Sequence, residues 1–106
     1  MGLANSLRHR VRVEQPSKTR DETGQPIKAW TPVVTLWADI RVLGGLETIK
    51  AGAVTPAVKA SIRIRARDGI DSGMRVVHGS KVYQIEAVLP DLVGRRHLDL
   101  VCEVTG

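Results

Sequence analysis

Several kinds of residue are scarce in this sequence of 106 residues. A single cysteine, Cys102, excludes an intramolecular disulfide and a four-cysteine zinc site. The only aromatic residues are Trp30, Trp37 and Tyr83, which disfavours a protein that binds single strands by base stacking. No apolar run approaches the ~20 residues of a membrane-spanning helix, and no apolar segment follows the arginines near the start. We therefore expect neither a membrane protein nor a secreted precursor.

Acidic residues are also outnumbered, with 11 Asp and Glu against 16 Lys and Arg, which gives a net charge of +5 at pH 7. This balance favours anionic partners, nucleic acid above all. Hydrophobic residues make up 42% of the chain and charged residues 25%, as in ordinary globular proteins. The length supports one modest core, so residues 1–106 are expected to form a single domain, made in a reducing cytoplasm.

Alternation of apolar and polar residues, the period of a β-strand, recurs along the chain, whereas helical spacing is nearly absent. The predicted strands are Leu7–Glu14, Ile27–Val34, Leu36–Leu43, Ile62–Arg67, Met74–His78, Lys81–Leu89 and His97–Val104. His9 and Leu89 fall on the apolar faces of their segments and are expected in the core. The sequence predicts an all-β fold, a small antiparallel β-barrel or sandwich of about seven strands.

Turn residues separate the predicted strands. Asp21–Pro26, Gly79-Ser80 and Asp91–Gly94 are rich in the residues that turns require. Pro32 cannot donate a backbone hydrogen bond, which predicts that its strand lies towards an edge of the sheet. Residues 44–57 do not alternate and contain three glycines and Pro56, so we expect one long loop there. That loop is either an insertion without a role or an arm that becomes ordered against a partner.

The chain offers little for catalysis. Cys102 alternates with apolar residues on the last strand, where burial makes a thiol inert. His9, His78 and His97 are not at metal-ligand spacing, and no acidic or cysteine cluster accompanies them. Gly44-Gly45 lacks the lysine and hydroxyl residue of a phosphate-binding loop. We expect a protein that is not an enzyme and holds no cofactor or metal.

Two surface features remain. Alternation places Arg8, Arg10 and Arg12 on one strand face, and Arg63, Arg65 and Arg67 on another. Such rows either bridge phosphates, form ion pairs with Glu14, Glu86 and Asp99 on neighbouring strands, or contact a protein. Trp30 and Trp37 lie on polar faces of their segments, where they either pack on each other or mark a contact surface.

Taken in order, several segments resemble the phage head–tail adaptor family, also called head–tail joining or head-closure proteins. They are Leu7–Pro16, Asp21–Gly24 with Trp30 behind it, Leu36–Glu47, Ser61–Ile70, Met74–Val76, Lys81–Ile85 and Leu98–Glu103. A Trp-Ala pair followed by a Gly-Gly-x-Glu loop, here Trp37 to Glu47, is characteristic of that family. The likeness covers nearly the whole chain.

The resemblance implies a structural protein of the head–tail junction of a phage or prophage virion, made in the bacterial host cytoplasm. Family members look like small β-barrels that assemble as a ring, with about twelvefold symmetry, below the portal and its connector. The ring closes the DNA channel after packaging and joins the tail, while isolated subunits are expected to stay monomeric. The implied partners are further copies, portal or connector, tail-completion proteins and packaged DNA, without a membrane.

The resemblance also suggests which residues make contacts. The expected assembly residues are Gly44, Gly45, Leu46, Glu47, Ile49 and Lys50 of the loop, with Trp30 and Trp37. The expected basic residues of the DNA channel or an interface are Arg8, Arg10, Arg12, Lys59, Arg63, Arg65 and Arg67. An alternative function is a stand-alone basic β-barrel that binds nucleic acid phosphates through its arginine-lined strands. A related joining module elsewhere in the neck is a third reading.

Overall fold

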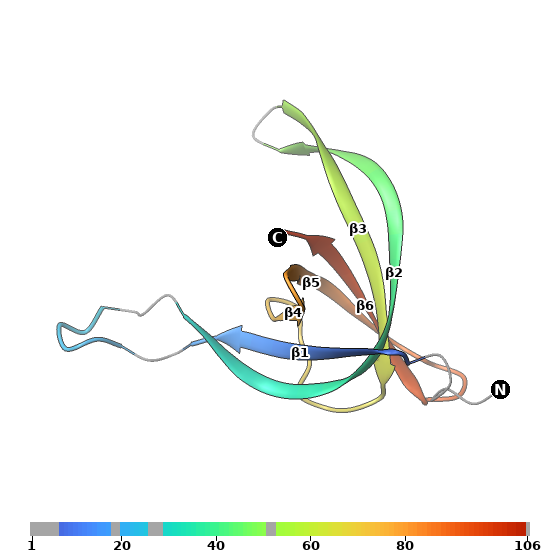
Figure 1. Cartoon of the computed structure of the whole chain (residues 1–106), viewed down its shortest axis with the longest axis horizontal. Coiled ribbons are helices and arrows are strands. Elements are labelled where there is room, and N and C mark those ends of the chain that lie inside the picture. Colours follow the sequence, from blue (N-terminus) through green and yellow to red (C-terminus); the bar gives the residue numbers. More distant parts are fainter. Residues whose placement is uncertain (1–6, 18–19, 26–28, 51–52, 106) are drawn as a thin grey trace.

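The computed structural model describes residues 7–17, 20–25, 29–50 and 53–105, and for residues 44–50 and 53–57 only the backbone is described. These residues form an all-β fold (Figure 1). Its six strands are β1 (His9–Pro16), β2 (Trp30–Lys50), β3 (Ala53–Arg65), β4 (Arg75–His78), β5 (Lys81–Pro90) and β6 (His97–Val104). Among the described residues we find no helix long and apolar enough to span a membrane.

The strands close into an antiparallel barrel in the order β1-β2-β3-β6-β5-β4. Pairing of β1 with β4, from Arg12 opposite Val77 to Glu14 opposite Arg75, completes the circle. A barrel this small has no lumen, because side chains from every strand fill its interior. The predicted β-barrel is therefore confirmed, and the alternative of two packed sheets is not what the chain forms.

The core contains the apolar residues that the alternation predicted. Val11, Ile62, Ile64 and Leu100 are among the largest fully buried side chains. The remaining buried members of the cluster are Val13, Ala38, Ala60, Ile70, Val76, Tyr83, Ile85, Leu98 and Cys102. Most of these side chains are β-branched or aliphatic, so they pack well on a pleated surface and favour strands over helices.

The strand count differs from the prediction because two predicted strands are one. β2 runs unbroken from Trp30 to Lys50, whereas Ile27 lies outside the described residues. Pro32 does not interrupt the strand, since in the described barrel residues 30–37 of β2 pair with β1 alone. Over these residues the other edge of β2 has no hydrogen bond to a neighbouring strand that a proline could remove. The predicted edge position of Pro32 is therefore confirmed.

The prediction of a long loop at residues 44–57 is wrong. The backbone of residues 44–50 and 53–57 continues β2 and β3 as a hairpin, from Gly45 opposite Val58 to Lys50 opposite Ala53. The pairing shifts between Val42 and Gly45, so the two glycines serve a β-bulge and not a loop. Residues 51–52, at the tip, lie outside the described residues.

Two residues that the alternation placed in the core are exposed. His9 lies on the surface, where its ring contacts the ring of His78 edge-on with 5.1 Å between centroids. Leu89 is 52% exposed because a bulge between Ile85 and Ala87 adds one residue to β5. The extra residue reverses the alternation, so Val88 packs against the core in place of Leu89.

Two extensions project from the barrel in different directions (Figure 1). One is the β2–β3 arm, which we define as Gly45–Lys50 and Ala53–Val58. The other, the β1–β2 arm, is the segment between β1 and β2, of which residues 17, 20–25 and 29 are described. In its turn, Asp21 Oδ1 accepts hydrogen bonds from the N–H groups of Thr23 and Gln25. The radius of gyration is 15.3 Å, against about 13 Å for an ordinary compact domain of this length. The arms account for the difference.

Candidate assembly surfaces

The β2–β3 arm leaves two strand edges open. β3 pairs with β6 only over Lys59–Arg65, and β2 pairs with β1 only as far as Ala38. Beyond those points, the arm strands pair with each other and with no other described strand. Open edges present rows of backbone N–H and C=O groups that another chain can pair with. The arm is therefore a template for strand addition.

The predicted assembly residues Gly44, Gly45, Leu46, Glu47, Ile49 and Lys50 all lie on the β2 side of this extension. Their side chains lie outside the described part of the molecule. At the base of the arm, Val42, Leu43 and Val58 are exposed to 60%, 53% and 41%. Contiguous exposed apolar side chains often mark a surface that contacts another molecule.

Trp30 and Trp37 lie on the same strand and do not pack on each other, because seven residues of β-strand separate them by about 20 Å. Both face outwards, since the register shift between Val13 and Glu14 leaves Val33 as an extra residue of β2. Each indole lies under an arginine. The Cζ atom of Arg75 is 4.3 Å from the Trp30 ring centroid, and that of Arg10 is 5.6 Å from the Trp37 ring centroid. Cation–π contact is favourable in both places.

Glu14 is the one buried charged residue among those described, with 5% exposure. Its carboxylate accepts hydrogen bonds from Arg12 Nε at 2.7 Å and Arg75 Nε at 2.8 Å. Burial disfavours the charged form, but the hydrogen bonds from Arg75 and Arg12 outweigh it and hold the pKa of Glu14 below its ordinary value. Glu14 thereby joins β1 to β4 at the seam that closes the barrel.

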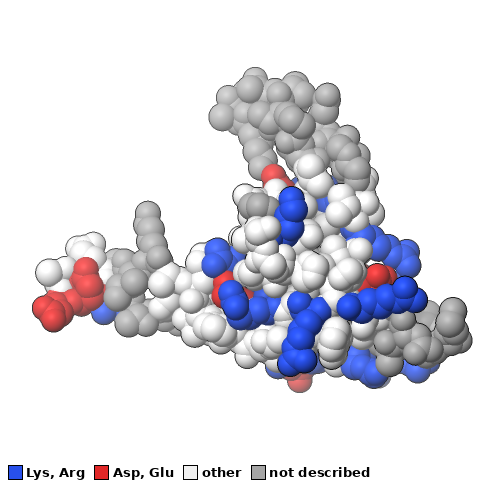
Figure 2. Space-filling view, viewed as in Figure 1, with Lys and Arg blue, Asp and Glu red and all other residues white. Residues whose placement is uncertain are grey.

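Two further predicted basic residues are held in ion pairs. Arg63 donates from Nε and Nη2 to the two carboxylate oxygens of Asp99 at 2.9 and 3.1 Å. Lys59 Nζ lies 2.5 Å from Glu86 and 3.6 Å from Glu103. The hydrogen bond that Arg63 donates to Asp99 is the main reason that the pKa of Arg63 is raised, and the hydrogen bond that Lys59 donates to Glu86 raises the pKa of Lys59 in the same way. Figure 2 shows acidic and basic atoms interspersed over the barrel.

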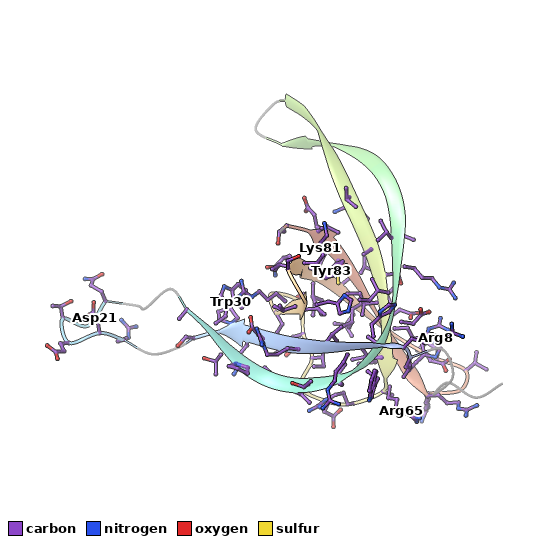
Figure 3. All side chains as sticks on the ribbon, in the orientation of Figure 1. Arg8, Asp21, Trp30, Arg65, Lys81 and Tyr83 are labelled. Carbon is purple, nitrogen blue, oxygen red and sulfur yellow. The ribbon has the colours of Figure 1, made fainter. Side chains whose placement is uncertain are left out.

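The other predicted arginines lie towards one end of the barrel. Arg8 and Arg65 are found there, at the opposite end of the molecule from Asp21 (Figure 3). Arg65 and Arg67 line a hollow of about 330 Å³ together with Trp37, which is 51% exposed. Its remaining lining residues are Leu7, Thr35, Leu36 and Ala66. The hollow is apolar with a basic rim.

The β5–β6 turn lies beside that hollow, because the Ala66 N–H donates to the Arg96 carbonyl at 3.1 Å. Leu92 and Val93 in this turn are the most exposed large apolar residues described. We call this surface the arginine end, and it consists of Arg65, Arg67, Leu92, Val93, Arg95 and Arg96. The turn itself was predicted, but its role as a surface was not. Two apolar residues within a turn, followed by two arginines, are the sequence signal for it.

The described residues assemble no catalytic or metal-binding group. Burial raises the pKa of the Cys102 thiol to about 12, so the thiolate that reacts as a nucleophile is scarce. His97 lies near two carboxylates, with Nδ1 3.4 Å from Asp91 and Nε2 3.6 Å from Asp99. No three His, Cys, Asp or Glu side chains in this part of the chain could hold a metal ion. What the surface offers is strand edges, apolar patches and charge.

Comparisons with known proteins agree with this picture. The family model described as phage head completion protein matches residues 3–105. A curated relative, the head completion protein gp7 of Enterobacteria phage HK97, is 28% identical over 70 residues, which are 66% of this chain and 62% of that protein. The matched stretch thus spans less than two thirds of the relative.

Two solved structures share the fold. A chain in the virion of a native gene transfer agent particle is 19% identical with a TM-score of 0.73, covering 92% of this chain and 93% of that one. Protein SF1141 from Shigella flexneri 2a is 24% identical with a TM-score of 0.70, covering 96% of this chain and 95% of that one. Because the family model matches residues 3–105, nearly the full length, the chain belongs to the phage head completion protein family, whose members are structural, non-enzymatic virion components.

Proposed function

We propose that this protein assembles as a ring below the portal and its connector, closes the DNA channel after packaging and joins the head to the tail. The observation that carries the proposal is the β2–β3 arm, whose two edges are open and whose base is apolar. A protein that acts alone gains nothing from such an arm, and open edges expose it to aggregation. Family membership supports a structural role for the same surface.

Strand addition is the mechanism by which the arm acts. An edge of β2 or β3 in one copy pairs with a backbone edge of a neighbouring copy or of the connector, with hydrogen bonds between main chains. Fixing the arm and the partner costs conformational and rotational entropy, so isolated subunits stay monomeric. The portal vertex concentrates the copies and offsets that cost.

A closed ring requires heterologous interfaces, in which one patch meets a different patch on the next copy. The chain has distinct surfaces for this purpose, the β2–β3 arm and the β1–β2 arm. These surfaces point in different directions from the barrel (Figure 3). Among the predicted basic residues, Arg10, Arg65 and Arg67 would face DNA or another interface.

The alternative function, a stand-alone module that binds nucleic acid phosphates, has weaker support. A continuous phosphate track needs uncompensated cations, whereas Arg12, Lys59 and Arg63 are already bound to carboxylates. Affinity for bare duplex DNA that falls steeply with salt would favour this alternative. A position elsewhere in the neck, such as tail termination, would need the same structural module with other partners.

An arm-shortened variant tests the proposal. Leu43 is joined to Lys59 through an Asn-Gly turn, which continues the register set by Val42 opposite Ala60. None of the described core residues is removed, so the barrel is expected to fold with an unchanged urea midpoint. Particles that carry this variant should fill with DNA but fail to retain it or to attach tails. Full infectivity with the shortened arm would refute the proposed role of the arm.

A further inference from the structure

The β5–β6 turn presents two apolar side chains to solvent on a firmly built backbone. Leu92 is 83% exposed and Val93 is 99% exposed. The Asp91 carboxylate accepts hydrogen bonds from the N–H groups of Val93 at 3.2 Å, Gly94 at 3.0 Å and Arg96 at 3.3 Å. These bonds organise the turn without using the apolar side chains, so Leu92 and Val93 are free of any role in its folding.

The turn is also fixed to the barrel. The Asp91 N–H donates to the His97 carbonyl at 3.1 Å, and the Ala66 N–H donates to the Arg96 carbonyl at 3.1 Å. The backbone hydrogen bonds from Gly94 and Arg96 lower the pKa of Asp91, so its carboxylate stays charged at neutral pH. A segment that is already ordered loses little entropy on binding, and its exposed apolar groups then contribute more fully to affinity.

The surroundings of these two side chains are basic. Arg95 and Arg96 follow them in the turn, and Arg65 and Arg67 line the hollow beside it. The Asp91 carboxylate is occupied by the hydrogen bonds of the turn itself. The arginine end thus combines an apolar centre with a positively charged border. Buried apolar anchors with arginines around them are the usual composition of a binding hot spot.

We propose that the arginine end docks onto a protein of the particle other than this chain, at an apolar pocket bordered by carboxylates. This inference rests on the proposed role in the neck and adds the chemistry of the partner. DNA is a poor occupant, because phosphates gain nothing from Leu92 and Val93. A second copy is also a poor occupant: the arginine end of that copy carries charge of the same sign and would repel it, and the β1–β2 tip at Asp21 is a polar turn.

Four variants test the inference. Val93→Ser removes the apolar anchor, and Val93→Ile keeps it as the matched control. Arg96→Glu reverses a charge of the border, and Lys81→Glu makes the same reversal at the first residue of β5, at the other end of that strand. All three positions are exposed, so all four variants are expected to fold and melt as the wild-type protein does.

The probes are the portal–connector complex and the tail-completion protein from the same genome, each purified, with dissociation constants measured at two salt concentrations. Val93→Ser and Arg96→Glu should weaken binding to one of these probes about tenfold. Val93→Ile and Lys81→Glu should bind as the wild-type protein does. The effect of Arg96→Glu should shrink at high salt.

Any of the following results would contradict the inference. Unchanged binding of all four variants to both probes would exclude the arginine end as the docking surface. A loss confined to self-association would assign it to a second copy, and a loss confined to binding of a duplex DNA probe would assign it to DNA. If the wild-type protein binds neither probe, the proposed function itself fails. Wild-type binding without any variant effect refutes the docking surface alone.

Discussion

Replacement of Glu14 by Gln removes the charge of a buried carboxylate while keeping its shape. The side chain accepts two hydrogen bonds, from Arg12 and Arg75, and hydrogen bonds to charged groups contribute about 1.5–3 kcal/mol each. The Arg12 side chain is 49% exposed and can bind water again when its partner changes. We therefore expect the free energy of unfolding to fall by about 2 kcal/mol, which is close to the contribution of one of these hydrogen bonds and not of both. For a domain of this length that lowers Tm by about 9 °C.

The pH dependence gives this prediction its sign. Because the folded-state pKa of Glu14 lies below its ordinary value of 4.5, its contribution to stability is fully present above that value. It is lost as the pH falls through the folded-state pKa. The stability difference between wild type and Glu14→Gln should thus be about 2 kcal/mol at neutral pH and should vanish once the wild-type carboxyl is protonated.

Urea unfolding followed by far-UV circular dichroism, at several pH values, measures this difference. Glu22→Gln is the matched control, because it removes the same charge from an exposed position in the β1–β2 turn. That control should change stability by less than about 0.5 kcal/mol at every pH. A Glu14→Gln difference that stays constant from neutral to acidic pH would refute the assignment of the stability to the ionised carboxylate.

Three further outcomes follow from the packing. Ile62→Val should lower the free energy of unfolding by about 1 kcal/mol in urea titrations, since it removes one methylene group from a fully buried site; no loss would contradict the assigned core. Asp99→Asn, which breaks the pair with Arg63, should cost about 1 kcal/mol at low salt and less at high salt; a salt-independent cost would contradict an ionic contribution. Cys102 should react with a thiol reagent only at the rate of unfolding, measured with and without urea; rapid reaction of the native protein would contradict its burial.

Alternation predicted the barrel well because each strand is buried on one face only. Val11, Ile62 and Leu100 lie in the core as their pattern indicates. The error at Leu89 occurs because a bulge before it adds one residue and reverses the faces. A bulge depends on the register between two strands, which a single sequence does not reveal.

The β2–β3 arm was mistaken for a loop for a related reason. Gly44 and Gly45 lie at a bulge and Pro56 lies in a strand with an open edge, and both residue types are also typical of loops. Among the described strands the arm pairs only with itself, so its residues do not share the register of the barrel strands. The residues alone left two interpretations open, an arm that becomes ordered against a partner and an insertion without a role, and the resemblance to a known family agreed with the arm.

The charged contacts could be foreseen only in outline. Pairing of the arginine rows with Asp99 and Glu86 was one of the interpretations left open by the sequence. Arg63 does pair with Asp99, whereas Glu86 pairs with Lys59. The partnership of Glu14 with Arg75 joins residues 61 positions apart and requires the barrel to close. The arginine end brings together a strand end and a turn that lie far apart in the chain, so the sequence indicates its pieces but not its surface.

The most direct test of the central claim is native mass spectrometry of the purified chain mixed with the portal–connector complex from its own genome. We predict that the mass of the complex increases by that of a full ring of copies, and that the arm-shortened variant does not produce this increase. Failure of the wild-type chain to add to the complex, together with salt-sensitive affinity for duplex DNA, would contradict the assembly role and favour the nucleic-acid module.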